Sequence, residues 1–345
     1  MKTRIYFLFL MLVFRNSSSY AQEMDASPVG VMISHGHPKG GWMFSYSYMN
    51  MAMKNNYSGS KKLTDEVIWN NYIFSPQSMQ MNMHMLMGMY GLTGRLSLML
   101  MANYIKSNME VALPPGTELS HNHNGGSSSS MESTIHKHSI SGMSDCKFWT
   151  LYKLHNGPGS ALVLSVGVNF PTGSIHIPAG EHALYEGERH TYMMQLGTGT
   201  YDFLPGITFL KRKNKLSWSA QLAGTLRPFT NALGYRYGND LTLNFWTAYQ
   251  LKSFMSVSLR AEAYEAESIK GRDPKIYSII EPDANPKNYG GQRASTYVGL
   301  NFYINKTFLK ESKLGIEAGI PIYQNLNGPQ LGQQQSLYVG IIKSF

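Results

Sequence analysis

The sequence predicts an all-β fold, a transmembrane antiparallel up-and-down β-barrel of about twelve strands. The first observation behind this prediction is composition: only 15% of the 345 residues are charged, against ~25% in an ordinary soluble domain. Mean hydropathy is −0.25, and beyond the first segment no apolar run reaches the ~18 residues of a spanning helix. A helical membrane protein is therefore excluded, and an aromatic content of 12% argues against disorder. The single cysteine, Cys146, excludes an internal disulfide.

The second observation is a period-two alternation of apolar and polar side chains along most of the chain after residue 40. Over 241–251 one face carries Leu, Phe and Tyr, and the other carries Thr, Asn, Trp and Gln. The segments 255–263, 296–304 and 314–322 alternate in the same way. A strand in a bilayer needs one lipid face and one lumen face, which this pattern supplies. A soluble β-sandwich also alternates, so this pattern alone leaves both folds open.

The third observation, the length of the connections, separates these two folds. Strands are predicted at 42–53, 79–90, 95–107, 137–153, 161–171, 191–210, 216–228, 239–251, 254–266, 294–305, 313–323 and 335–345. Long connections such as 108–136 and 267–293 alternate strictly with short ones such as 252–253. Outer-membrane barrels have short periplasmic turns and longer outer loops, whereas a sandwich has no reason to sort its connections. The barrel is therefore the favoured fold.

The two ends of the chain indicate export and insertion. Lys2 and Arg4 precede an apolar run over 5–14, and Ala21 completes a small-residue cleavage motif, which is the pattern of a signal peptide. We therefore expect residues 1–21 to be a signal peptide, 22–41 an N-terminal periplasmic or plug segment, and 42–345 the barrel. The last predicted strand ends on Phe345, which is similar to the assembly signal of outer-membrane barrels, although Lys343 departs from it. The predicted location is the outer membrane of a Gram-negative bacterium.

Four blocks of sequence carry a family resemblance. They are Pro-Gln-Ser-Met-Gln-Met at 76–81 with Met-Tyr-Gly-Leu-Thr-Gly-Arg-Leu at 89–96, Phe-Pro-Thr-Gly-Ser-Ile at 170–175, Gln-Leu-Gly-Thr-Gly-Thr-Tyr-Asp at 195–202, and Ala-Gly-Ile-Pro-Ile-Tyr at 318–323. Together they resemble the outer-membrane transporter family named after the MetA pathway of phenol degradation. The resemblance implies a monomeric barrel with a transport role, and it assigns no catalytic residue. The high Met and His content departs from the general pattern of that family.

Methionines are concentrated on the first predicted strands. The chain has 22 of them, and six occupy alternate positions over 79–89, so their side chains share one face. We expect this stripe to face lipid, which leaves Gln80, Asn82 and His84 to line the lumen. Other methionines share a face with Ser or Asn and are expected to point inward. The full set of predicted lumen-lining residues is Met49, Met51, Met53, Gln80, Asn82, His84, Met99, Met101, Asn244, Trp246, Arg260 and Glu262.

Three His-X-His pairs are candidates for metal binding. They are His35 and His37, His121 and His123, and His136 and His138. In an extended chain the two side chains of such a pair lie on one face about 6.6 Å apart, and imidazole suits Cu, Zn and Ni. Copper is the candidate metal, because thioethers also favour Cu(I). Two alternatives stay open: the histidines are polar loop composition, and the methionines form a pliable apolar lining.

The function favoured by these observations is a passive transporter or channel for small solutes, including hydrophobic or aromatic ones. The alternative is a Met- and His-rich envelope protein that binds or exports copper. An enzyme is not expected, because the chain has no Gly-X-Ser-X-Gly nucleophile motif and no phosphate-binding loop followed by a helix. The net charge of +9 lies partly at the short turn 211–215, which suits lipid phosphates rather than nucleic acid. Expected partners are outer-membrane lipid and lipopolysaccharide, the solute and the barrel assembly machinery, with the chain acting as a monomer.

Overall fold

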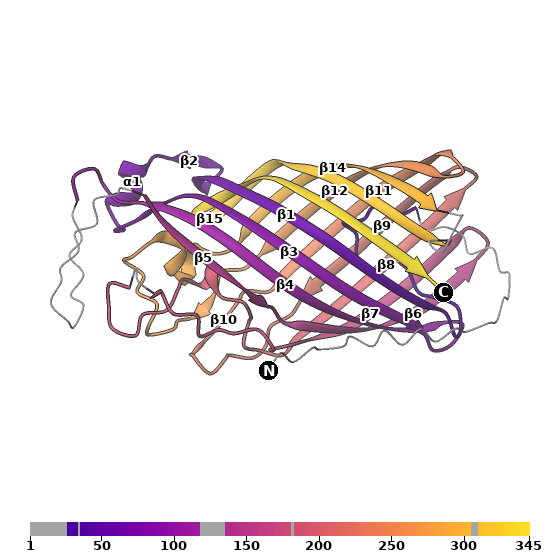
Figure 1. The fold of residues 1–345 in the computed structure, drawn as a ribbon, viewed down its shortest axis with the longest axis horizontal. Helices are drawn as coiled ribbons and strands as arrows, with labels where there is room; N and C mark the ends of the chain where they lie inside the picture. Colours follow the sequence, from indigo (N-terminus) through magenta and orange to yellow (C-terminus); the bar gives the residue numbers. More distant parts are fainter. Residues whose placement is uncertain (1–25, 34, 118–134, 181–182, 305–309) are drawn as a thin grey trace, which may run out of the picture.

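The fold is an antiparallel sheet that closes on itself into a barrel (Figure 1). The computed structural model describes residues 26–33, 35–117, 135–180, 183–304 and 310–345. Closure is made by β1 (Trp42–Gly59), which pairs with β3 (Ser75–Gly91) on one side and with β15 (Ser312–Ser344) on the other. A closed sheet pairs the backbone groups that an open edge would expose. Closure is therefore what a sheet needs in order to lie in lipid.

The remaining barrel strands follow one another around the sheet in chain order. They are β4 (Leu96–Ala112), β5 (Ile135–Met143), β6 (Cys146–Gly157), β7 (Ser160–Phe170), β8 (Asp202–Lys213), β9 (Leu216–Thr225), β11 (Asp240–Lys252), β12 (Met255–Ala266) and β14 (Gly291–Ile304). The connections hold β2 (Lys61–Leu63), α1 (Asp65–Trp69), η2 (Tyr192–Met194), β10 (Tyr235–Arg236), β13 (Lys270–Gly271), η3 (Pro282–Ala284) and η4 (Pro286–Asn288). No helix in the described part of the chain is long and apolar enough to cross a bilayer.

The long strand β15 contains two antiparallel arms. Residues 312–326 pair antiparallel with β14, and residues 326–344 pair antiparallel with β1. Because β1 and β14 themselves run in opposite directions around the sheet, the chain must reverse near residue 326. With β5 and β6 counted as one interrupted pass, the barrel has twelve passes: β1, β3, β4, β5 with β6, β7, β8, β9, β11, β12, β14 and the two arms of β15. The predicted fold class is confirmed.

The connections alternate in length as the sequence predicts. The short ones, 92–95, 158–159, 214–215 and 253–254, lie at one end of the barrel, and the long ones, 60–74, 171–201, 226–239 and 267–290, lie at the other. Two predicted strands are wrong in detail. Residues 191–201 alternate like a strand but form η2 and an inward loop. The Tyr192 side chain packs among the other loops, whereas Met194 and Leu196 pack in a cluster with inner-face residues of the barrel. The predicted strand 137–153 is split at Asp145, whose carboxylate turns to bind loop backbone at Gly173 and Thr198.

The outer face of the barrel is apolar over most of its strands. Side chains such as Leu243 on β11, Leu259 on β12 and Ile320 on β15 are about half exposed, at 50%, 56% and 55%. Their neighbours along each strand, such as Asn244 and Arg260, are buried on the inner face. This is the arrangement of a transmembrane barrel, in which lipid-facing and lumen-facing residues alternate.

We expect Leu243→Lys or Leu259→Lys to destabilise the barrel, because each places an ammonium on the lipid-facing side, where a lysine at the bilayer midplane costs about 2–4 kcal/mol. Thr242→Lys is the matched control, since Thr242 is on the inner face of the same strand, and it should cost less than about 1 kcal/mol. The measurement is urea unfolding of the refolded protein in lipid vesicles. Equal costs at positions 242 and 243 would contradict the assigned faces.

Candidate functional site in the barrel lumen

The N-terminal segment, residues 26–33 and 35–41, lies inside the barrel. Its backbone is contacted by side chains from strands on all sides of the sheet. Lys313 Nζ of β15 donates to Ser27 O (3.0 Å), and Gln221 Nε2 of β9 donates to Met32 O (2.9 Å). Near its end, His37 N donates to Ser97 Oγ of β4 (3.0 Å). Since β4, β9 and β15 are separated around the sheet, a segment that contacts all three must cross the lumen.

A charged network on the inner face holds this segment at its centre. Arg260 of β12 donates from Nε to Glu317 Oε1 of β15 (2.9 Å) and from Nη2 to Glu317 Oε2 (3.1 Å). The same guanidinium donates from Nη1 to Asn244 and to Glu262, and it lies 3.6 Å from the ring centre of Tyr297. The Arg260 and Glu317 side chains are each only 1% exposed. A buried arginine is tolerated here because its charge is paired and its donors are used.

Gly30 is where the N-terminal segment meets this network. Its backbone N–H donates to Glu317 Oε2 at 3.0 Å. A Cβ at this position would collide with the Glu317 carboxylate and the Arg260 guanidinium. Only glycine therefore lets the backbone approach the ion pair this closely.

The opposite side of the lumen is a methionine wall, formed by the inward methionines of β1, β3 and β4. These are Met43, Met49, Met51 and Met53 of β1, Met79, Met81, Met83, Met85, Met87 and Met89 of β3, and Met99, Met101 and Met109 of β4. Many of them are directly opposite one another in the register, for example Met43 with Met89 and Met89 with Met99. Directly opposite residues share a face, and Met43, Met89 and Met99 are all buried. The wall therefore faces the lumen.

This placement corrects the sequence prediction for β3. Gln80, Asn82 and His84, predicted to line the lumen, lie on the outer face instead. The register shows it, because His84 is opposite Tyr48 and Asn82 is opposite Asn50, both on the outer face of β1. The Tyr48 hydroxyl donates to Asn82 Oδ1 (2.6 Å). The physical reason is that a filled lumen buries an apolar stripe as well as lipid does, so apolar character alone does not identify the lipid face.

The other predicted lumen residues lie on the inner face. Met49, Met51, Met53, Met99 and Met101 belong to the methionine wall, and Asn244, Trp246, Arg260 and Glu262 lie on β11 and β12 across the lumen. The lumen thus has one thioether-lined side and one polar, charged side. Their role in selecting a solute remains a prediction.

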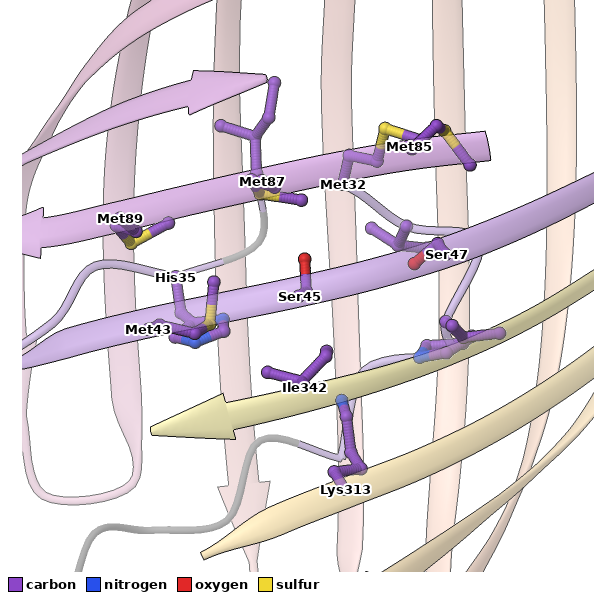
Figure 2. Close-up of a pocket in the computed structure, with 14 residues that line it drawn as sticks. Met32, His35, Met43, Ser45, Ser47, Met85, Met87, Met89, Lys313 and Ile342 are labelled. Atoms are coloured by element: carbon purple, nitrogen blue, oxygen red, sulfur yellow. The ribbon is translucent and has the colours of Figure 1, made fainter. Parts of the chain in front are cut away.

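A cavity of about 30 Å³ lies between the N-terminal segment and the methionine wall. Figure 2 shows Met43, Met87 and Met89 from the wall and Met32 and His35 from the segment around it. Ser45, Ser47, Met85, Lys313 and Ile342 complete the labelled lining. By volume the cavity holds about two water molecules. The lumen is therefore almost filled at this level.

The long loops interlock over the other end of the barrel. Arg189 Nη1 donates to both carboxylate oxygens of Asp273 (2.7 Å each), and Thr191 Oγ1 donates to Asp283 Oδ2 (2.7 Å). These contacts join the loop 171–201 to the loop 267–290. The phenol of Tyr192 also accepts from Asp273 N (3.0 Å). The two loops therefore pack against each other and form one cover over this end of the barrel.

Several carboxyl groups are buried within this cover, among them Glu188, Glu281 and Asp283. Burial and the neighbouring Asp283 hold the pKa of Glu281 well above its ordinary value. Burial also raises the pKa of Asp283 to about 6, and the pKa of Glu188 nearby is raised for the same reason. A buried carboxyl with a raised pKa favours the protonated form in the packed state. The cover should therefore be most stable at low pH.

We expect the packing of the loop 267–290 to weaken as the pH rises from about 4 to about 7. The packed state binds more protons than the detached loop in this range, so its stability falls with pH, by about 1–3 kcal/mol for one carboxyl. Glu281→Gln should remove much of this loss and protect the loop at pH 8. Amide hydrogen exchange of 267–290, with variant and wild type compared at each pH, measures the effect. The exposed Glu186→Gln is the control, and a Glu281→Gln variant less protected than wild type at pH 8 would contradict the prediction.

The predicted histidine pairs that the structure describes lie in different parts of the protein. His35 and His37 lie in the N-terminal segment with ring centres 5.3 Å apart. His136 and His138 lie on β5 at the loop end, where the His138 ring is 5.0 Å from the ring of His190. His121 and His123 lie outside the described residues. Among the residues that the structure describes, no three His, Cys, Asp or Glu side chains are arranged to hold a metal ion.

Some inner-face residues were not identified from the sequence. Glu317 is the main partner of Arg260, and Gln221 and Asn301 hold the N-terminal segment through its carbonyl groups. A signal for Glu317 does exist, because it is a carboxylate in an otherwise Leu- and Ile-rich strand. Its alternation with those residues places it on the inner face.

The fold was compared with known proteins. No protein-family model and no curated protein sequence matches the chain. A solved structure, the COG4313 outer membrane channel from Pseudomonas putida F1, matches with a TM-score of 0.57 and 13% identity, over 91% of this chain and 98% of that one. The chain has the fold of a bacterial outer-membrane channel. The P. putida toluene transporter TodX also aligns, with a TM-score of 0.44 and 14% identity, over 90% of this chain and 91% of that one. The match to the COG4313 channel confirms the barrel fold that the resemblance of the four sequence blocks implies.

Proposed function

We propose that the protein is a passive outer-membrane channel for small solutes, whose lumen is closed at rest by its own N-terminal segment. The observation that carries this proposal is the path of residues 26–33 and 35–41 through the barrel, held at intervals by lumen side chains. Solutes would pass by diffusion once the segment shifts. No energy-coupling element is needed in this mechanism.

The contacts of the segment suit a displaceable plug. Apart from the ammonium groups of Lys313 and Lys153 and the carboxylate of Glu317, its described partners are neutral side chains such as Gln221, Asn301 and Ser97. A neutral hydrogen bond contributes only about 0.5–1.5 kcal/mol net, because water replaces it when it breaks. The same lumen side chains are polar enough to be hydrated after the segment leaves. The segment is therefore bound firmly in sum, although each bond is weak.

The methionine wall favours small apolar or aromatic solutes. Thioether side chains are flexible and polarisable, so they adapt to solutes of different shape and contact aromatic rings favourably. The charged side of the lumen, with Arg260 and Glu262, would contact a polar substituent on the same solute. An amphipathic solute such as a substituted benzene fits both sides of this lumen.

Three further statements belong to the same proposal. Residues 1–21 would be the signal peptide and 42–345 the membrane barrel. Lipopolysaccharide would contact the lysines at the loop end, such as Lys54, Lys61 and Lys62, through its phosphates. The closed sheet would be inserted by the barrel assembly machinery and act as a monomer, because the pairing of β1 with β15 closes the barrel within one chain.

The function is tested by uptake into cells that produce the protein in their outer membrane. We expect faster uptake of a small aromatic probe such as phenylnaphthylamine than in cells without the protein. Replacing Met81 and Met83 together by Gln should slow this uptake, since it makes the methionine wall polar. The outer-face change Gln80→Ala is the matched control and should have no effect. Equal uptake with and without the protein would overturn the channel proposal.

A further inference from the structure

The cavity between the N-terminal segment and the methionine wall is surrounded by soft donor atoms. Five thioethers line it: Met32 comes from the segment, Met43 from β1, and Met85, Met87 and Met89 from β3. Met32, Met43, Met87 and Met89 also belong to one packed cluster, in which Met43 and Met89 are buried. His35, also from the segment, adds an imidazole to the lining. Donors from two separate parts of the chain thus meet at one cavity (Figure 2).

The size of the cavity distinguishes between an ion and an apolar solute as its occupant. About 30 Å³ of space is the room of one or two water molecules. A six-membered ring does not fit in this space without moving the segment, whereas a single ion does. The cavity is therefore better suited to an ion than to the apolar solutes proposed for the open channel.

The donor chemistry narrows the choice of ion. Thioethers are soft ligands that select Cu(I), and imidazole accepts the same metal, whereas Mg²⁺ and Ca²⁺ need oxygen ligands. Zinc sites use Cys, His and carboxylate ligands, and no group of three such side chains is arranged for a metal within the described residues. A soft monovalent cation is what this lining would select.

The charges near the cavity also limit the charge of the ion that it can bind. Lys313 is on its lining, and its ammonium donates to Ser27 O at 3.0 Å. Figure 2 places Lys313 beyond Ile342, away from the end of the cavity where Met89 and His35 lie. Neutral thioether ligands add no charge, so the bound ion would carry one positive charge. A monovalent ion is less costly here than a divalent one.

We propose that this cavity binds one soft monovalent cation, Cu(I) or its analogue Ag(I), through the thioethers of Met43, Met87 and Met89 with Met32 or His35 from the N-terminal segment. Because these ligands come from both the segment and the barrel, the ion ties the segment into the lumen. The binding site does not depend on the proposed channel function. The effect of the bound ion on permeability does rest on the proposed channel function.

The test is a titration of the full-length protein in detergent with Cu(I), under reducing conditions, in competition with a chromophoric Cu(I) chelator. We expect one ion per chain and copper–sulfur scattering in the X-ray absorption spectrum of the complex. Zn²⁺ should not compete. Thioethers carry no proton, so binding should persist at pH 5, reduced only by any imidazole contribution.

The variants use Leu, which keeps the apolar volume and removes the sulfur. Met43→Leu with Met89→Leu should weaken Cu(I) binding by about tenfold or more. Met79→Leu with Met109→Leu is the control, because these residues lie on the same wall in a different packed cluster. Should the first pair fail to fold, Met32→Leu with His35→Ala changes only the segment and should also weaken binding. The proposal is overturned if wild type binds no Cu(I) or Ag(I), or if the control pair lowers affinity as much as the cavity pair.

A second readout separates this site from the channel. Ag(I) should lower solute uptake by wild type and leave uptake by the Met43→Leu, Met89→Leu variant unchanged. If the ion binds with the expected stoichiometry and no protein-dependent uptake exists, the site stands and the channel proposal falls. If uptake occurs and no ion binds, the channel stands and the site falls.

Discussion

Deleting residues 22–41 should open the lumen and increase the permeability of the barrel by about ten- to a thousandfold, the ratio expected if the open state of wild type is populated at about 0.1–10%. The segment contacts strands on all sides of the lumen, including Lys313 of β15, Gln221 of β9 and Ser97 of β4. Removing it empties the part of the lumen that it crosses and leaves the loop cover at the other end in place. The deletion keeps Trp42, the first residue of β1, so the closing pairs with β3 and β15 remain.

The measurement is single-channel conductance in planar bilayers, supported by swelling of vesicles in a small neutral sugar. Heat-modifiable mobility on a gel verifies that the shortened barrel is folded. Gln221→Ala in the full chain is an intermediate case, because it removes one anchor of the segment and should raise the frequency of brief openings. Identical conductance of the deleted and full-length proteins would show that the segment does not close the lumen.

Replacing Arg260 alone should destabilise the barrel by about 3–5 kcal/mol, because it leaves a buried carboxylate without its partner. Arg260→Met removes both hydrogen bonds to Glu317 and the contact with the Tyr297 ring. Glu317→Gln should cost less, since Gln still accepts from Gly30 N and from the guanidinium. The double change Arg260→Met with Glu317→Gln should recover part of the loss, because no buried carboxylate then remains at this position.

Urea unfolding in lipid vesicles measures each of these changes, and the double-mutant cycle gives the coupling energy of the pair. Arg189→Met is a useful comparison, because it removes an ion pair with Asp273 in the loops rather than in the barrel. It should loosen the loop cover with little effect on unfolding of the barrel. Additive costs for Arg260 and Glu317 would contradict their assignment as one buried pair.

Much of the barrel could be predicted from local pattern. The period-two alternation on β11 and β12 placed Asn244, Trp246, Arg260 and Glu262 on the inner face, where the structure has them. The alternation of short and long connections also predicted the antiparallel order and twelve passes. Both depend on neighbouring residues, because each strand presents its own two faces and each turn joins consecutive strands.

The same local pattern predicted the wrong face for a strand whose apolar side could be buried either by lipid or by the filled lumen. Over 79–89 the methionines define one face of β3, but lipid and a filled lumen bury a thioether equally well. The register against β1 decides between them, since Met89 is opposite the buried Met43 and Gly88 is opposite the exposed Phe44. The strand expected at 191–201 was wrong for a similar reason, because its alternating side chains are buried by the other loops and by the inner face of the barrel.

The sequence by itself thus determined the fold class, the alternation of the connections and the faces of the strands that have one clearly polar side. Only the tertiary structure decided which way the methionine stripe points, that Arg260 pairs with Glu317, and that residues 26–33 and 35–41 lie in the lumen. Those features join residues far apart in the chain, as Gly30 N and Glu317 Oε2 are. No local periodicity encodes such contacts. They are set by which inner surfaces meet once the sheet has closed.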